Sequence, residues 1–261
     1  MADAPATETL RDYVSSQRAD LEADLPHLDD EEAVHRARTR ARRARSVLAA
    51  YDGLTPAGRL GKDLRWLGRT LGPLRDLDII RSRVEAPDLV PHLLDHEHAA
   101  VLDEVRSALA GDRADRLREG LRDVCRADAW ADLPTDPLSD AAPRVLAAER
   151  ERVLRRDRVA AHAGADRPAR LHDVRKAAKR LRYAAEAAGR ESLAADAQAV
   201  QDLLGAGTDA ALTAAWLDRT ARAHPALSGA LRAESDRQWA DAHVDDAVYT
   251  EAVEALRGAD L

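Results

Sequence analysis

The feature that most constrains this chain is a pattern of one histidine and four cations that occurs twice. His35 is followed by cations after 3, 7, 8 and 10 residues, and the same spacings follow His172, 137 residues further along. A leucine–glycine pair and an aspartate come after each copy: Leu71-Gly72 with Asp76, and Leu204-Gly205 with Asp209. Two linked matches in the same order indicate two copies of one structural unit.

The spacings place the histidine and three of the cations on one face of a helix. An α-helix turns by about 100° and rises about 1.5 Å per residue, so the pattern makes a narrow stripe about 15 Å long. The stripes are His35, Arg38, Arg42 and Arg45 in the first copy, and His172, Arg175, Lys179 and Arg182 in the second. Further cations lie beside the stripes: Arg43, Lys176 and Arg180.

The stripes carry far more positive charge than a helix normally leaves without a partner. Six arginines and no acid occur from His35 to Arg45, in a chain whose net charge is -7. Like charges three or four residues apart repel by a few tenths of a kcal/mol per pair. A single basic face is usually only solvated, but its repetition indicates binding of an external anion. Arginine suits phosphate because its planar fork donates paired hydrogen bonds.

The composition predicts an all-α fold. Alanine, leucine, arginine and glutamate favour helices, and aromatic residues make up only 3% of the chain. The apolar periodicity predicts helices over 9–25, 30–50, 55–71, 74–86, 91–110, 113–127, 143–163, 168–188, 191–204, 210–223 and 225–256.

The segment 132–142 is the expected linker, because residues 132–143 contain three prolines and no periodicity. We therefore expect one domain over 1–261, made of an N-terminal helical half, 7–131, and a C-terminal half, 143–256. The N-terminal half includes an expected helical hairpin over 89–127.

These residues resemble the CHAD family, the conserved-histidine α-helical domains. That family carries a histidine followed by spaced cations on a helix, twice, and a leucine–glycine turn followed by aspartate. The similarity covers roughly residues 7–223. The resemblance implies two four-helix bundles related by pseudo-twofold symmetry, here with the inserted hairpin. It also implies a basic central pore or groove that binds inorganic polyphosphate, since CHAD proteins are associated with polyphosphate granules.

Carried over by position, the resemblance assigns the polyphosphate contacts to both stripes. The helix expected over 55–71 adds three cations on one face: Lys62, Arg65 and Arg69. Their counterparts in the second half are not cationic: Ala195, Gln198 and Asp202. We therefore expect the first half to dominate binding. Asp76 and Asp209 would cap helices or orient arginines.

Other functions find weaker support in the sequence. His92 and His96 are four residues apart, and His98 is close to them, as in some metal sites. The HExxH pattern is absent, however, and no third ligand is evident. Nucleic-acid binding by the same helices is one alternative, although aromatic platforms are few. A metal-dependent polyphosphate- or phosphate-processing enzyme is another, but it needs a nucleophile and a carboxylate-held metal. We expect a protein that is not an enzyme and uses no cofactor.

The sequence also bears on partners and location. Residues 1–9 are polar, and no window approaches 18 uncharged apolar residues. Cys125 is the only cysteine, so an intrachain disulfide cannot form. We expect a cytoplasmic protein, at polyphosphate granules, whose partner is a long polyanion and neither a membrane nor nucleic acid.

Overall fold

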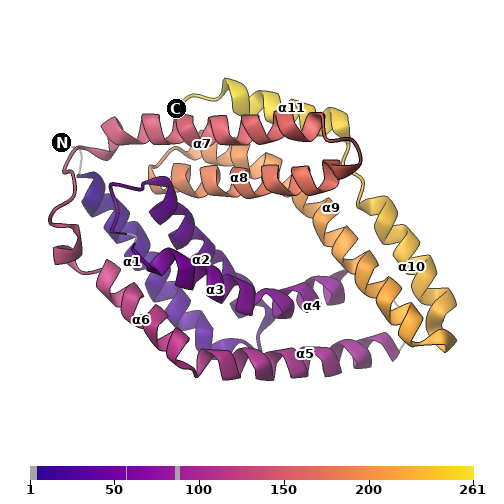
Figure 1. Cartoon of the computed structure of the whole chain (residues 1–261). Coiled ribbons are helices and arrows are strands. Elements are labelled where there is room, and N and C mark those ends of the chain that lie inside the picture. Colours follow the sequence, from indigo (N-terminus) through magenta and orange to yellow (C-terminus); the bar gives the residue numbers. More distant parts are fainter. Residues whose placement is uncertain (1–4, 57, 86–88) are drawn as a thin grey trace.

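The structure, a computed structural model, describes residues 5–56, 58–85 and 89–261. These residues form helices joined by short turns, and the sole extended pairing among them is a bridge between Pro5 and Pro137. The expected all-α fold is therefore confirmed. The α-helices in the described ranges are α1 (Ala6–Asp24), α2 (Glu31–Ala50), α3 (Leu60–Thr70), α4 (Gly72–Arg83), α5 (Leu89–Leu109), α6 (Asp112–Val124), α7 (Leu138–Ala161), α8 (Arg167–Ala187), α9 (Glu191–Ala223), α10 (Ser228–Asp241) and α11 (Asp246–Gly258) (Figure 1).

Helix α2 lies at the centre of the N-terminal half. Asp30 caps its start, because the Asp30 carboxylate accepts a hydrogen bond from the Glu32 backbone amide. Glu31 and Glu32 also favour the positive end of the helix dipole. One face of α2 is buried, and α2 packs against α1 and α3. The apolar residues of this buried face are Val34, Ala37, Ala41, Ala44, Val47 and Leu48. The cations occupy the rest of the helix surface.

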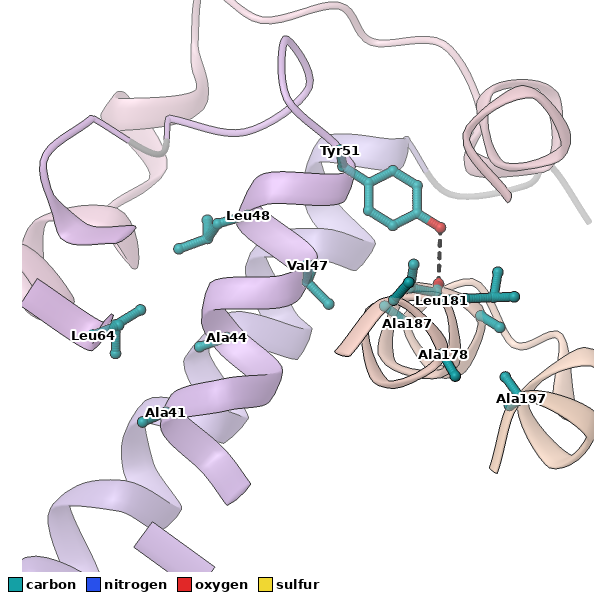
Figure 2. Close-up of a cluster of buried hydrophobic side chains, with 14 of the residues drawn as sticks. Ala41, Ala44, Val47, Leu48, Tyr51, Leu64, Ala178, Leu181, Ala187 and Ala197 are labelled. Atoms are coloured by element: carbon teal, nitrogen blue, oxygen red, sulfur yellow. Dashed lines mark hydrogen bonds between the residues drawn. The ribbon is translucent and has the colours of Figure 1, made fainter. Parts of the chain in front are cut away.

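Helix α8 has the same position in the C-terminal half, where it packs between α7 and α9. Val174, Ala178 and Leu181 are fully buried on its apolar side. The two halves meet where α2 packs beside α8. There the buried Tyr51 hydroxyl donates a hydrogen bond of 2.9 Å to the Ala184 carbonyl (Figure 2). The halves therefore share one hydrophobic core, and the two cationic helices are neighbours.

A second hydrophobic cluster joins the halves at the far end of the molecule. Leu77 and Ile80 of α4 and Leu94 of α5 pack there with Trp216 and Leu217 of α9. Helix α5 contacts α4, whereas α6 contacts α3, and α5 and α6 follow one another along one edge of the fold (Figure 1). The expected hairpin over 89–127 is therefore not an antiparallel pair, because a different helix buries the apolar face of each member.

Two helix starts differ from the prediction. Helix α3 begins at Leu60 instead of residue 55, because Gly58 adopts a left-handed conformation with φ of 44°. Helix α7 begins at Leu138 instead of residue 143, so residues 138–142 of the expected linker 132–142 are helical. Burial of Leu138, Ala141 and Ala142 favours this longer helix. Pro143 is the sixth residue of α7, so it removes the hydrogen bond that a backbone amide there would donate to the Ser139 carbonyl.

Two helix boundaries in the C-terminal half also differ. The prediction of a break at 205–209 is wrong, since α9 is continuous from Glu191 to Ala223. The helix expected over 225–256 is instead divided into α10 and α11. Asp245 starts α11, where its carboxylate accepts hydrogen bonds from the amides of Ala247 and Val248.

Candidate anion-binding site

The two cationic stripes lie on neighbouring helices and face a common space. Burial, and then the charges of Arg42 and Arg175, lower the pKa of Lys179 to about 6. Burial, and then the charges of Arg65, Arg42 and Arg180, lower the pKa of Arg45. Charges perturb each other this strongly only at short range. Residues from α2, α3 and α8 therefore converge, and the stripes do not point to opposite solvent faces.

These cations line one depression of about 290 Å³, which we call the basic depression. Helices α2, α3, α7 and α8 contribute to it. Its charged lining comprises eight cations and the acid Asp173, with the cations being Arg42, Arg45, Arg65, Arg152, Arg156, Lys176, Lys179 and Arg180. This excess of cations fits a polyanion and no cationic or neutral ligand.

A buried glutamate fixes one wall of the basic depression. The side chain of Glu149 on α7 is only 4% exposed. One of its oxygens lies 2.7 Å from Nη2 of Arg180, and the other accepts a hydrogen bond of 3.1 Å from Nε of Arg152. Arg180 also donates to the Ala49 carbonyl at the end of α2. Arg180 and Arg152 are thus held in place before any ligand binds.

Other cations of the basic depression lack a protein counter-charge. Arg42, Arg45 and Lys179 make no ion pair with any acid in the described part of the chain, whereas the neighbouring Arg43, Arg180 and Arg182 all do. Lys176 is paired with Asp173 at 3.3 Å. Burial and the surrounding positive charge disfavour the charged forms of Arg45 and Lys179. A bound polyanion would relieve this repulsion.

Arg38 and Arg175 occupy equivalent places in the two repeats. Nη1 of Arg38 donates a hydrogen bond of 3.0 Å to the Leu71 carbonyl, next to Gly72. Nε of Arg175 donates at 3.4 Å to the Gln201 carbonyl, and its guanidinium lies against Gly205.

A Cβ atom would lie 3.3 Å from Nη1 of Arg38 at residue 72, and 2.9 Å from Nη2 of Arg175 at residue 205. The repeated glycines therefore make room for an arginine of the cationic stripe. Only the first glycine coincides with a helix boundary, because α9 continues through Gly205.

Asp76 and Asp209 place negative charge close to these arginines. Burial, and then the charge of Asp209, raise the pKa of Asp76, whereas Arg38 lowers it. Asp209 in turn favours the charged forms of Arg175 and Lys179. Asp209 lies inside α9, so the interpretation that it caps a helix is wrong. Asp76 likewise favours the charged form of Arg38, and the expectation that the two carboxylates orient arginines stays a prediction.

The two repeat histidines are exposed at the starts of their stripes. Partial burial, and then Arg75, lower the pKa of His35. Partial burial, and then Lys176, Arg175 and Lys179, lower the pKa of His172. The surrounding cations thus disfavour protonation of both rings, and a bound phosphate would favour it.

Arg43 and Arg182, like Lys176 and Arg180, are expected contacts that are already paired within the protein. Arg43 and Arg182 both reach the Glu186 carboxylate, at 3.3 and 2.8 Å. Their guanidinium groups both lie over the Tyr183 ring, each 5.5 Å from its centre. Glu186 and Tyr183 therefore satisfy these arginines, and their role as phosphate contacts stays a prediction.

Helix α3 carries the three further cations that were expected to contact polyphosphate. Arg65 lines the basic depression, and the charge of Arg69 lowers the pKa of Arg45. Lys62 is exposed on the same helix but is not part of the lining. Contacts of Lys62 and Arg69 with phosphate stay predictions.

Sequence reasoning missed Arg152 and Arg156, which line the basic depression from α7. Their spacing of four residues places them on one face of a helix. That signal was present in the sequence, but acids surround it, at Glu149, Glu151 and Asp157. Because the repeat motif does not include α7, only the packing of α7 on α8 reveals the contribution.

The other groups that the sequence singles out are the clustered histidines and Cys125. They contain no group of three metal-ligating side chains. Of the three clustered histidines, His98 lies 3.4 Å from the buried Asp78 carboxylate. Cys125 is a half-buried free thiol. No helix in the described ranges is long and apolar enough to cross a membrane.

The fold and the site together define an all-helical protein that gathers cations from two repeats into one depression. Residues 10–218 match the family model of the CHAD domain, and the chain belongs to this family. The resemblance seen in the sequence is thereby confirmed.

Two curated relatives match most of the chain. The uncharacterized protein MT2285 of Mycobacterium tuberculosis (strain CDC 1551 / Oshkosh) is 29% identical over 204 residues, which are 71% of this chain and 40% of that protein. Rv2226 of strain ATCC 25618 / H37Rv gives the same values. The chain thus spans about two fifths of the length of these relatives.

The crystal structure of the CHAD domain from the plant Ricinus communis matches with a TM-score of 0.81 and 23% identity, over 99% of this chain and 94% of that chain. PptA from Streptomyces chartreusis matches with a TM-score of 0.71 and 18% identity, over 96% and 100%. Both likenesses show the shared fold.

Proposed function

We propose that this chain binds inorganic polyphosphate, without catalysis, in the basic depression between α2, α3, α7 and α8. The observation that carries the proposal is the convergence of basic side chains from both repeats on one space, where Arg42, Arg45 and Lys179 have no acidic partner in the described part of the chain. Membership of the CHAD family supports the choice of polyphosphate, since proteins of that family are associated with polyphosphate granules. We extend the proposal to the cell, where such a protein would gather at these granules.

The length and charge of the site favour a polymer over a single phosphate ion. Each stripe extends along about 15 Å of helix, which exceeds the size of one phosphate group. The basic depression holds eight cations, more than one phosphate can contact. Polymer binding releases the counterions that surround a linear polyanion, so affinity should fall steeply with salt.

The lining of the basic depression favours polyphosphate over nucleic acid. Nucleic-acid sites commonly stack bases on aromatic side chains. The lining residues include no aromatic side chain, and the nearby Tyr183 ring is covered by Arg43 and Arg182. Polyphosphate has no base to stack, so it needs no aromatic side chain in the lining. A competition titration between polyphosphate and RNA at about 0.15 M salt tests this preference.

The proposal is tested by reversing two charges of the basic depression. In the double variant Arg42→Glu, Arg45→Glu, we expect affinity for long polyphosphate to fall at least tenfold, measured by calorimetry. The matched control is Arg116→Glu with Arg122→Glu on α6, where both side chains are exposed. It changes the net charge by the same amount outside the basic depression.

Circular dichroism establishes that both double variants are folded. Equal losses of affinity in the two would show that only net charge matters, and unchanged binding in the first would place the site elsewhere. Either result would overturn the proposal.

A further inference from the structure

A second cavity, of about 610 Å³, lies beside the start of the cationic stripe of α8. The start of α8, the middle of α9 and the end of α10 enclose it. Its wall is mostly apolar, and we call it the apolar pocket. Its lining residues are Arg167, Pro168, Ala169, Leu171, His172, Leu204, Gly207, Thr208, Ala211, Trp239, Ala242, His243 and Val244. Cavities of roughly 300–1,000 Å³ commonly hold small organic ligands.

Trp239 lines the apolar pocket with an accessible aromatic ring. The residue is 47% exposed, which is unusual for so large an apolar residue. The ring is held in position, because its indole nitrogen donates a hydrogen bond of 3.3 Å to the Asp218 carboxylate. A fixed and accessible ring is well suited to stack against a planar heterocycle.

His172 joins the apolar pocket to the cationic stripe. The ring lines the pocket, and its residue is the first member of the second stripe. Lys176, Arg175 and Lys179 are close enough to disfavour its protonation. One edge of the pocket therefore opens toward positive charge, while the wall around Trp239 and Leu204 is apolar.

The close approach of α9 and α10 shapes the opposite wall. A Cβ atom on Gly207 would lie only 2.8 Å from the Ala242 carbonyl oxygen, so glycine allows the end of α10 to meet α9. Arg167 at the pocket edge is paired with Asp246, whereas His172 on the same helix makes no ion pair in the described part of the chain. The pocket is thus apolar at Trp239, and a phosphate placed at His172 would favour protonation of the His172 ring.

We propose that the apolar pocket binds the base and sugar of a nucleoside polyphosphate, whose phosphates extend past His172 toward Arg175. A ligand with a planar ring at one end and a phosphate chain at the other matches the two ends of the pocket. The position of the phosphates rests on the proposed function, whereas the binding of the base rests on the pocket itself.

The test compares ATP with tripolyphosphate, since both carry three linked phosphates. Tripolyphosphate has at least as much negative charge, so electrostatics alone predicts that it binds at least as tightly. We expect ATP to bind at least tenfold more tightly in calorimetry. The variant Trp239→Leu should lower ATP affinity to that of tripolyphosphate and leave tripolyphosphate binding unchanged.

The matched control is Trp66→Leu on α3, where the ring contacts Arg113 away from the apolar pocket. This variant should retain the preference for ATP. Quenching of tryptophan fluorescence by ATP should also disappear in Trp239→Leu and remain in Trp66→Leu.

The inference is overturned if wild-type protein binds ATP no more tightly than tripolyphosphate, or if Trp239→Leu keeps the preference. Titration with long polyphosphate separates this failure from that of the proposed function. Binding of the long polymer without a preference for ATP would reject only the apolar pocket. A failure of all three compounds to bind would reject both proposals.

Discussion

The lowered pKa of Lys179 predicts how many protons the protein takes up when it binds a polyanion. In the free protein, burial and the charges of Arg42 and Arg175 lower its pKa to about 6. At pH 8.5, less than about 1% of free molecules then carry a charge on this amine. A bound polyanion supplies the missing counter-charge and should return the pKa toward the ordinary value of about 10.4. Binding at pH 8.5 should therefore take up about one proton.

The sign of this linkage fixes the pH dependence. Because the bound form has the higher pKa, affinity is greatest at low pH and falls as the pH rises between the two pKa values. One linked proton changes the binding constant by about tenfold per pH unit. The lowered pKa values of His35 and His172 add proton uptake at lower pH, so pH 8.5 isolates the contribution of Lys179.

The assay is calorimetry of polyphosphate binding at pH 8.5 in buffers of different ionisation enthalpy. The slope of observed enthalpy against buffer enthalpy gives the number of protons taken up. We expect about one for the wild type and close to zero for Lys179→Arg, because arginine remains charged throughout. A wild-type slope near zero would refute the claim that Lys179 is neutral in the free protein and charged in the complex.

Three further predictions follow from named contacts. Gly207→Ala should lower the melting temperature, because its Cβ would meet the Ala242 carbonyl at 2.8 Å, whereas Gly229→Ala, with open space around it, should not. Arg156→Glu should lower the affinity for long polyphosphate more than the affinity for tripolyphosphate, since Arg156 lies on the α7 wall of the basic depression; equal losses of affinity in calorimetry would contradict this placement. Tyr51→Phe should lower the free energy of unfolding by about 1 kcal/mol in urea titrations, because it removes one buried hydrogen bond; an unchanged midpoint would argue against that bond.

Much of the fold was predictable because the repeat and the apolar periodicity are local signals. Asp30 at the start of α2 and the apolar faces of α2 and α8 follow directly from residue spacing. The continuity of α9 did not follow, because glycine usually indicates a turn. At Gly205, however, the missing side chain makes space for Arg175 instead. This contact joins two helices, so the sequence around Gly205 does not reveal it.

The candidate site was predictable to a similar extent. The stripe residues Arg42, Arg45 and Lys179 converge as their helical positions require. Pairing of Arg182 with Glu186 and the contribution of Arg152 depend on which helices are neighbours. Residue spacing fixes the face of one helix, but it does not determine what another helix brings to that face.

The most direct test of the account is a calorimetric comparison of long polyphosphate with orthophosphate at equal total phosphate and about 0.15 M salt. If cations of both repeats form one site for a polymer, the long chain should bind at least a hundredfold more tightly per phosphate than the single ion, with an affinity that falls as salt increases. Equal affinities per phosphate would contradict a shared polymer site.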